Sequence, residues 1–222
     1  QSYSAPLENR RNLLRLDFNE NTLGPSQKVY EAIKDINLNQ ISIYPEYNLL
    51  KKFVSNHYYE SRQFDSEEIG LFNGADAAIN AIFNSFGDRD EIFLTTNPTF
   101  GYYSPCSEIQ GMRKITCAYE GENFLFPIKR FKEKIIKHKP KLIFICNPNN
   151  PTGTVLSAQE IIKLANLNKK SLIVVDELYE KFNGDSLLPV IDFKKIKNIV
   201  VIQSLSKTAG LAGLRIGFAF GH

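Results

Sequence analysis

Short apolar runs alternate with longer amphipathic stretches from residue 69 to the end of the chain. Runs of four to six apolar residues predict strands, whereas apolar positions that return every three or four residues predict helices. Strands are expected at Ile69–Phe72, Glu91–Thr95, Lys114–Cys117, Lys141–Cys146, Ser171–Val175, Asn198–Ile202 and Arg215–Phe220. Helices are expected between them, at Ala75–Phe86, Phe100–Gln110, Ile128–His138 and Ser157–Asn168.

The alternation of strands and helices predicts the type of sheet. Helices that connect successive strands act as crossovers, and crossovers place neighbouring strands parallel. The segments Leu142–Ile145 and Leu172–Val175 are apolar without a break, which is typical of strands covered on both faces. The expected fold class is therefore α/β, with a mostly parallel sheet and helices on both faces. Ligands of such sheets bind beyond the carboxyl ends of the strands.

The beginning of the chain has a different pattern. Residues 1–45 are polar and irregular except for a helical pattern at Ser26–Ile36, and we expect them to form an N-terminal arm. A large domain is expected over residues 46–222, starting with an amphipathic helix after Tyr44 and Pro45. With 43% hydrophobic and 23% charged residues, the chain is not of the disordered or low-complexity class.

Charge and cysteine usage narrow the functional classes. The net charge of +3 is too small to indicate a nucleic-acid or membrane partner. The longest uncharged stretch, Leu142–Gln159, is interrupted by Asn, Pro and Gly, so no transmembrane helix is expected. The three cysteines form no C-x-x-C pair, and there are only three histidines, so we expect no metal site. Reduced thiols and the absence of a signal-peptide pattern predict a cytoplasmic protein.

Polar and small residues follow four of the predicted strands, at the edge where a ligand would bind. After Ile69–Phe72, Gly74 permits a tight turn, and the helix that starts there offers unpaired N–H groups to an anion. After Lys141–Cys146 comes a loop with two prolines, which restrict its backbone. The candidate residues at these four ends are Asn73-Gly74-Ala75-Asp76, Asn147-Pro148-Asn149-Asn150-Pro151-Thr152-Gly153, Asp176-Glu177-Leu178-Tyr179 and Gln203-Ser204-Leu205-Ser206-Lys207.

Two of these residues suggest chemistry. Asp176 directly follows an apolar strand, so its carboxylate is desolvated unless a positive group pairs with it. Lys207 lies among hydroxyls and small residues, which suits an amine of lowered pKa. Each short motif alone is more often a turn, a cap or a solvated side chain. Their joint occurrence after successive strands indicates one binding site.

These motifs resemble those of fold-type I pyridoxal-phosphate enzymes of the class I/II aminotransferase family. The resemblance rests on the Asn147–Gly153 loop, on Asp176-x-x-Tyr179, on Ser204-x-Ser206-Lys207 and on Arg215 eight residues after the lysine. Within the family, the histidinol-phosphate aminotransferase branch has segments similar to Leu16–Pro25, Tyr44–Glu46, Asn73–Asp76 and Pro98–Gly101. Thr22 stands where relatives commonly have Pro, and Phe100 stands where Tyr is usual. The similarity runs from about Leu16 to Gly221.

The resemblance implies pyridoxal 5'-phosphate as the cofactor and Lys207, Asp176 and Tyr179 as catalytic residues. Lys207 is expected to carry the cofactor covalently and to move a proton, and Asp176 to pair with the nitrogen of the cofactor ring. The other expected cofactor contacts are Tyr179 and Asn150 to the phenolic oxygen, Phe100 to the ring face, and Ala75, Asp76, Ser204, Ser206 and Arg215 to the phosphate.

The resemblance also implies partners and substrates. Tyr44 is similar to a tyrosine that reaches the cofactor phosphate of a neighbouring subunit, which implies a homodimer. Asn21 and Tyr44 are the expected substrate contacts. The expected substrates are small amino and keto acids, namely histidinol phosphate or a similar amine and 2-oxoglutarate. Family members continue into a small C-terminal domain with a carboxylate-binding arginine, so we expect this chain to be truncated before that domain and doubtful as a catalyst by itself.

Other functions stay open at this point. Threonine-phosphate decarboxylases and aromatic or other amino-acid aminotransferases share all these motifs. A non-catalytic nucleotide-binding module is disfavoured because neither G-x-G-x-x-G nor G-x-x-x-x-G-K-[ST] occurs. Seven basic residues between Lys129 and Lys141 would suit a nucleic-acid surface. No aromatic platform or binding motif accompanies them, so we expect a solvated helix face and no nucleic acid.

Overall fold

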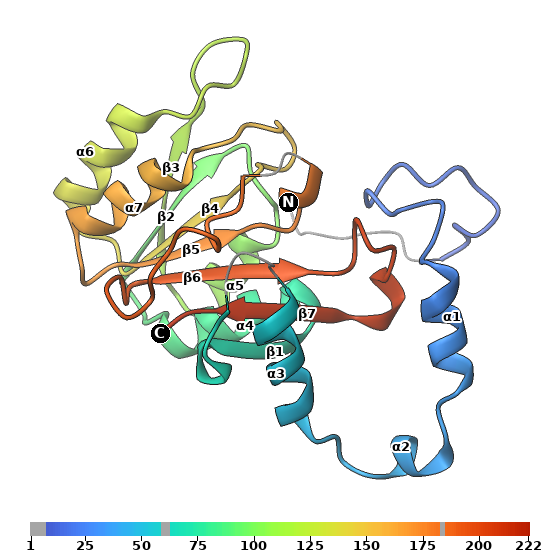
Figure 1. Cartoon of the computed structure of the whole chain (residues 1–222). Helices are drawn as coiled ribbons and strands as arrows, with labels where there is room; N and C mark the ends of the chain where they lie inside the picture. The colour runs from blue at the N-terminus through green and yellow to red at the C-terminus, as the bar shows by residue number, and fades with distance from the viewer. Residues whose placement is uncertain (1–7, 59–62, 183–184) are drawn as a thin grey trace.

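A seven-stranded sheet forms the centre of the molecule (Figure 1). The computed structural model describes residues 8–58, 63–182 and 185–222. The strands lie in the spatial order β1-β7-β6-β5-β4-β2-β3. Their bounds are Ile69–Asn73 (β1), Ile92–Asn97 (β2), Arg113–Ala118 (β3), Leu142–Cys146 (β4), Leu172–Asp176 (β5), Ile199–Ser204 (β6) and Ile216–Phe220 (β7).

The sheet is mostly parallel, as predicted, with one exception at β7. Strands β3, β2, β4, β5 and β6 run parallel to one another. Strand β7 is antiparallel to both β6 and β1. The expectation that successive strands are parallel is therefore wrong for β7. Between β6 and β7 there is only a loop with one short 3-10 helix, η3 (Ala212–Leu214), and without a crossover helix the chain returns antiparallel.

The helices lie close to their predicted positions. They are α1 (Gln27–Lys34), α2 (Leu38–Ser42), α3 (Tyr47–His57), α4 (Gly74–Phe86), α5 (Tyr103–Ile109), α6 (Ile128–His138) and α7 (Ala158–Leu167), with further 3-10 helices η1 (Ser66–Glu68) and η2 (Glu180–Phe182). Helix α5 begins three residues later than predicted. Helix α2 was not predicted, because its five residues carry no periodic pattern. A capping box between Asn37 and Gln40 starts it.

Helices cover both faces of the sheet. Alternate side chains of β4, such as Ile143 and Phe144, belong to different apolar clusters because successive residues of a strand point to opposite faces. One cluster packs against α3, α6 and α7, and the other packs against α4 and α5. The continuous apolar runs of β4 and β5 are buried on both faces, which confirms the predicted layer arrangement.

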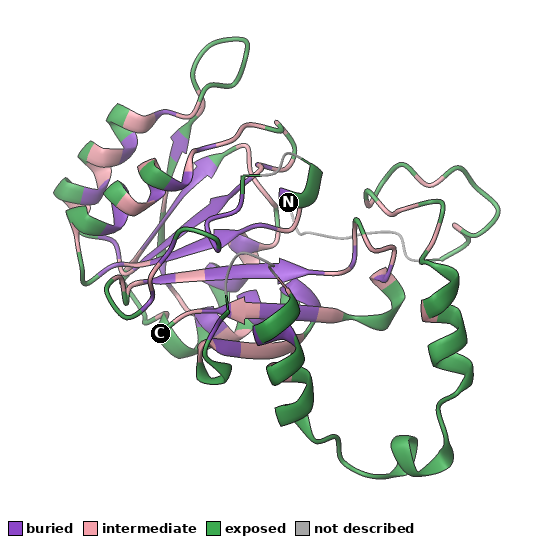
Figure 2. Ribbon diagram, viewed as in Figure 1, coloured by how far each residue is buried: buried purple, intermediate pink, exposed green. Residues whose placement is uncertain are grey.

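The N-terminal segment extends away from these layers. Helices α1 and α2 contain no buried residue, whereas Val54 attaches α3 to the sheet. Figures 1 and 2 show α1 and α2 as an exposed projection from the sheet. The division into an arm over residues 1–45 and a large domain over residues 46–222 stays a prediction, and residues 1–7 lie outside the described part.

The basic residues near α6 lie on the outside of the molecule. Phe131 and Ile135 are buried on the inner side of the helix. Arg130 forms an ion pair with Glu120 at 3.0 Å, and Lys132 forms one with Glu160 at 3.1 Å. These pairs are typical of a solvated helix face. Within residues 8–58, 63–182 and 185–222, no helix has the length and apolarity needed to cross a membrane.

Candidate active site

Asp176 lies at the carboxyl end of the central strand β5, and its side chain is only 2% exposed. The Tyr103 hydroxyl donates a 2.6 Å hydrogen bond to Oδ2, and the Leu178 N–H donates a 3.2 Å bond to Oδ1. Burial raises the pKa of Asp176 to about 6, although both hydrogen bonds and the positive charge of Lys207 act in the opposite direction. The carboxylate is thus held in a fixed orientation in an apolar environment.

Lys207 follows β6, and its amine is half-buried. Burial lowers the pKa of Lys207, while the carboxylates of Asp76, Glu20 and Asp176 act against this shift. Its Nζ donates a 2.6 Å hydrogen bond to the Phe18 carbonyl and lies 6.0 Å from the centre of the Tyr179 ring. An amine of lowered pKa beside a tyrosine and near three carboxylates is suited to proton transfer.

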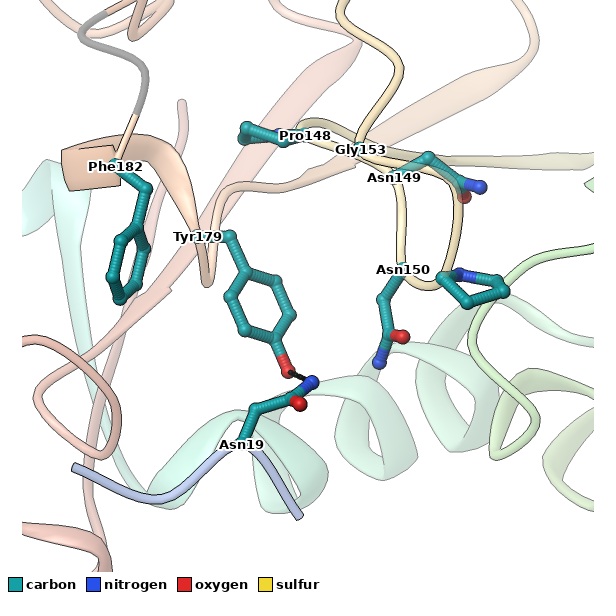
Figure 3. A pocket seen from close by; sticks show the side chains of 8 residues that line it. Asn19, Pro148, Asn149, Asn150, Gly153, Tyr179 and Phe182 are labelled. Atoms are coloured by element: carbon teal, nitrogen blue, oxygen red, sulfur yellow. Dashed lines mark hydrogen bonds between the residues drawn. The ribbon is translucent and has the colours of Figure 1, made fainter. Parts of the chain in front are cut away.

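A pocket of about 500 Å³ opens beside Tyr179. Figure 3 shows the side chains of Tyr179, Asn150 and Asn19 directed toward one another across it, with a 3.1 Å hydrogen bond from Asn19 Nδ2 to the Tyr179 hydroxyl. The pocket is lined by Asn19, Pro148, Asn149, Asn150, Pro151, Gly153, Tyr179 and Phe182. Asn150 and Tyr179, predicted to bind one oxygen together, therefore face the same space.

Two asparagine side chains hold the loop that carries Asn150. The side chain of Asn147 exchanges two hydrogen bonds with the backbone of Leu156, at 2.8 and 3.0 Å. Asn149 Nδ2 donates to the Pro98 carbonyl at 3.1 Å. Both asparagines are buried. Because these bonds satisfy buried polar atoms on both sides, they fix the loop against the neighbouring segments.

The start of α4 and Arg215 form a second, positively charged part of the site. Gly74 has φ +79°, and a Cβ built there would lie 2.4 Å from Arg215 Nη2. The guanidinium therefore lies directly over the first turn of the helix, where it also approaches Asp76 Oδ2 at 3.4 Å. Ala75 follows within the same turn. Unpaired helix N–H groups beside an arginine provide the donors that phosphate binding needs.

Ser204 and Ser206 directly precede Lys207 in the sequence, and their hydroxyl oxygens are 2.8 Å apart. Ser204 Oγ donates to the Ile216 carbonyl at 3.0 Å and accepts the Ser206 N–H at 3.1 Å. The single hydroxyl proton of Ser204 is thus directed at the backbone. Because the proton of Ser204 is used in this way, the Ser206 hydroxyl is the donor in the bond between the two serines.

The remaining predicted residues differ in their positions. The Phe100 ring contacts the Tyr103 ring edge-on at 5.5 Å, which places it next to the partner of Asp176. Asn21 Nδ2 donates to the carbonyl of Thr208, the residue after Lys207, at 3.1 Å. Tyr44 is 96% exposed and does not line the pocket, so the structure does not bring it to the site of its own chain.

Three features of this site were not predicted from the sequence. Tyr103 was predicted only as a helix residue, although residues three apart, such as Phe100 and Tyr103, share one side of a helix. In the structure α5 begins at Tyr103, and Phe100 lies just before the helix. The contacts of Phe18 and Asn19 with Lys207 and Tyr179 join residues about 160 to 190 positions apart, and no local pattern indicates such contacts. For Tyr103, the spacing from Phe100 was an available signal.

The chain is similar in sequence to one known protein family. The sequence profile of the family "Aminotransferase class I and II" matches residues 11–222. The chain is 34% identical to the histidinol-phosphate aminotransferase of Caldanaerobacter subterraneus subsp. tengcongensis, over 94% of this chain and 58% of that protein. It is also 34% identical to the enzyme of that name from Clostridium novyi, over 92% of this chain and 56% of that protein.

A solved structure has the same fold. The histidinol-phosphate aminotransferase of Sinorhizobium meliloti, determined in complex with pyridoxal-5'-phosphate, superimposes with a TM-score of 0.80 at 22% identity, over 92% of this chain and 55% of that one. The predicted fold-type I architecture is confirmed. The chain spans a little over half the length of the relatives it matches. With the family profile matched over nearly all of its residues, the chain belongs to the class I and II aminotransferase family.

Proposed function

We propose that this protein is a pyridoxal-phosphate-dependent aminotransferase that moves an amino group between histidinol phosphate, or a similar amine, and 2-oxoglutarate. The observation that carries the proposal is the arrangement of Asp176, Lys207 and Arg215. A buried carboxylate, an amine of lowered pKa and an arginine over a helix start are coupled electrostatically in one site. Membership of the aminotransferase family and the ligand of the Sinorhizobium meliloti structure support the same cofactor.

The residues of the site match the functional groups of pyridoxal phosphate. The cofactor has a phosphate, a basic ring nitrogen, a phenolic oxygen and an aldehyde. The α4 start with Arg215 suits the phosphate, since only a glycine fits under the guanidinium at position 74. The Asp176 carboxylate suits the ring nitrogen, and the pair Asn150 and Tyr179 suits the phenolic oxygen. Lys207 supplies the amine that reacts with an aldehyde.

Each residue then has a chemical task. When bound, the cofactor supplies an electron-accepting ring that stabilises the charge left on an α-carbon after its proton departs. Asp176 keeps a negative charge at the ring nitrogen in an apolar environment, where such a charge acts strongly. Lys207 takes and returns the proton at the α-carbon, for which its lowered pKa is suited. Tyr179 and Asn150 would hold the phenolic oxygen of the cofactor by hydrogen bonds.

The arm is proposed to contribute on the substrate side. Asn19 lines the pocket and Asn21 binds the backbone next to Lys207. Two curated relatives that match most of this chain, from Caldanaerobacter subterraneus and Clostridium novyi, are named histidinol-phosphate aminotransferases, which supports a substrate of that type and a role in histidine biosynthesis. Three buried, unpaired thiols at Cys106, Cys117 and Cys146 support a cytoplasmic location.

A homodimer is proposed to complete the site. The projecting segment of α1, α2 and the turn before α3 exposes large apolar side chains, among them Leu38 at 83% and Ile41 at 71% exposure. Large apolar side chains exposed along one segment are typical of a protein–protein interface. Tyr44 lies on this segment, so a second copy that covers it would bring Tyr44 near the site of its partner.

Spectroscopy of the purified protein tests the cofactor, and a substrate panel tests the reaction. Pyridoxal phosphate should give a yellow protein with a borohydride-reducible adduct, and Lys207→Ala should abolish that adduct. Amino transfer should be fastest with histidinol phosphate when it is compared with aromatic amino acids and threonine phosphate. A colourless protein contradicts the cofactor assignment, and decarboxylation without amino transfer contradicts the reaction.

A further inference from the structure

Glu177 is a buried carboxylate that the proposed chemistry does not use. It follows Asp176 directly, stands two residues before Tyr179, and is only 1% exposed. Burial of an ionisable side chain is costly unless its oxygens receive hydrogen bonds. Among the described residues no cation lies within ion-pair distance of Glu177, so hydrogen bonds must hold it.

Three donors converge on the Glu177 carboxylate. The backbone N–H of Leu187 donates to Oε1 at 2.6 Å, and the hydroxyl of Ser186 donates to Oε2 at 2.6 Å. The side-chain amide of Gln203, on β6, donates to Oε2 at 2.8 Å. Ser186 Oγ in turn accepts the Leu188 N–H at 3.1 Å. The carboxylate therefore joins the end of β5, the end of β6 and the 186–188 segment.

The position of this junction is significant because the backbone ladder ends there. The last paired residues of β5 and β6 are Asp176 and Ile202, and the Glu177 N–H donates the final ladder bond to the Ile202 carbonyl at 2.9 Å. Beyond this bond, β5 and β6 are no longer paired with each other. The segment after β5 carries Tyr179 next to Asp176, and the end of β6 and the segment after it carry the two serines and Lys207. The two halves of the site therefore lie on segments that the ladder no longer connects.

We infer that Glu177 is a positioning residue that fixes the Asp176–Tyr179 turn relative to the Ser204–Lys207 segment through its hydrogen bond with Gln203. The inference rests on the proposed function, because it assigns the residue a task in the cofactor site. Leu187 and Leu188 are fully buried in the core, so their segment gives the carboxylate a rigid support. Glu177 acts on the cofactor only through the neighbours that it holds in place.

The charges around Glu177 agree with this role. Burial raises the pKa of Glu177 to about 7, and the three hydrogen bonds act against this shift. The negative charge of Glu180 also raises the pKa of Glu177, and Glu180 is itself paired with Lys181 at 2.9 Å. The hydrogen bonds from Leu187, Ser186 and Gln203 all require an acceptor, which both oxygens of a carboxylate provide.

Glu177→Gln tests the inference because it keeps the shape of the side chain but replaces one acceptor with a donor. The test compares the intact variant with the intact wild-type protein by two measurements. In the absence of cofactor, amide hydrogen exchange at Leu178 and Ser206 should become about tenfold faster. The dissociation constant of pyridoxal phosphate, from its absorbance spectrum, should rise about tenfold.

Ser171→Ala is the matched control. Ser171 lies before β5, at the opposite end of the strand, and its buried hydroxyl donates to the Pro140 carbonyl. Its loss removes a buried hydrogen bond without touching the site, so exchange at Leu178 and Ser206 and the affinity for pyridoxal phosphate should stay at the wild-type values. A control that weakens pyridoxal phosphate binding as strongly as Glu177→Gln assigns the effect to general destabilisation and overturns the inference.

A double variant, Glu177→Gln with Gln203→Glu, tests whether the lost affinity for pyridoxal phosphate can be restored. It restores an amide–carboxylate hydrogen bond between positions 177 and 203 in the opposite direction, so part of the lost affinity should return. No recovery, or exchange that becomes faster only at residues 186–188, overturns the inference. If wild-type protein binds no pyridoxal phosphate, the proposed function fails, while hydrogen exchange and its recovery in the double variant still decide whether Glu177 joins the two segments.

Discussion

Burial shifts the pKa values of Asp176 and Lys207 in opposite directions, and both shifts favour the uncharged form. A basic ring nitrogen placed beside Asp176 would supply the positive partner that the carboxylate lacks in this environment. Without such a partner, hydrogen bonds from the Tyr103 hydroxyl and the Leu178 N–H stabilise the negative charge of Asp176. At the scale of single residues, the site is thus prepared for a cation at one end and a reactive amine at the other.

Tyr103→Phe should destabilise the protein more at high pH than at low pH. The change removes the hydroxyl donor but keeps a ring that packs against Phe144 at 4.9 Å. At pH 8 the Asp176 carboxylate is charged, and loss of a hydrogen bond to a charged group lowers the free energy of unfolding by roughly 1.5–3 kcal/mol. At pH 4 the carboxyl group is neutral and the loss should be smaller. Urea unfolding at both pH values measures the difference.

Tyr119→Phe is the control for this prediction. The Tyr119 hydroxyl lies 3.1 Å from the hydroxyl of Thr96, so both partners are neutral between pH 4 and pH 8. Its removal should cost the same at the two pH values. An equal loss at both pH values for Tyr103→Phe would mean that the hydroxyl does not stabilise the charged form of Asp176.

Asp176→Asn should change how stability depends on pH. In the folded protein the pKa of Asp176 is about 6, above the ordinary value of 3.8, so the stabilising effect of its proton is complete below pH 3.8 and is lost as the pH rises through 6. The loss amounts to about 3 kcal/mol for a shift of roughly two pKa units. The variant lacks this titration. Without cofactor, its free energy of unfolding relative to wild type should therefore rise between pH 4 and pH 7, as denaturant titrations will measure.

The same unfolding measurements with added pyridoxal phosphate compare how much stability wild type and Asp176→Asn gain from the cofactor. The cofactor brings a positive ring nitrogen to the wild-type carboxylate, so the stability gained from the cofactor should be larger for wild type than for Asp176→Asn. A parallel pH dependence of the two proteins without cofactor would contradict the raised pKa.

At the scale of elements, local patterns predicted most of the sheet and failed where pairing depends on distant segments. Uninterrupted apolar residues identified β4 and β5, because a strand covered on both faces needs no polar alternation. The antiparallel direction of β7 follows from the connection after β6, which lacks a crossover helix, but the contact of β7 with β1 joins segments about 150 residues apart. No spacing within either segment indicates that contact.

The same limit applies to the elements of the site. Asp176, Tyr179 and Lys207 could be named as candidates because they follow apolar strands, where a local pattern marks the end of the strand. Tyr103 depends on how α5 packs against the sheet, and Glu177 depends on a segment ten residues later. Residues that hold the site in place are recognised by their tertiary contacts, which the sequence does not display.

Gly74→Ala should disturb the start of α4 and the arginine above it. Gly74 has φ +79°, where a side chain is strained, and the new Cβ would lie 2.4 Å from Arg215 Nη2. We expect a loss of about 1 kcal/mol or more in stability from the backbone alone. Displacement of the guanidinium should also raise the dissociation constant of pyridoxal phosphate, by about tenfold or more. Thermal unfolding and absorbance titration measure the two effects.

Gly121→Ala separates the two causes. Gly121 has φ +64°, and nothing lies within 4 Å of a Cβ built there. It should lose comparable stability but bind the cofactor as wild type does. If both variants keep wild-type affinity, Arg215 has no part in binding the phosphate.

At the scale of the whole molecule, the chain divides into a well-buried layered body and an exposed projection. Figure 2 shows that the buried residues concentrate in the sheet, whereas α1 and α2 are exposed. Yet the projection is not a purely polar surface, because Leu38, Ile41, Ile43 and Tyr44 are all more than 60% exposed. Such side chains gain stability only when another surface covers them. A second copy of the chain is the partner that the family and the exposed Tyr44 favour.

Leu38→Asp combined with Ile41→Asp should therefore weaken self-association. Two charges placed in an apolar interface must be desolvated without partners, which raises the dimer dissociation constant by several orders of magnitude. Both residues lie on α2, which has no buried residue, so the fold of the body should be unaffected.

Ile136→Asp on α6 is the matched control, since Ile136 is 59% exposed but lies on the layered body. Sedimentation velocity should give a dimer for wild type and the control and a monomer for the double variant. Because Tyr44 is proposed to reach the partner's site, the monomer should also bind pyridoxal phosphate more weakly; a double variant that remains dimeric would place the interface elsewhere.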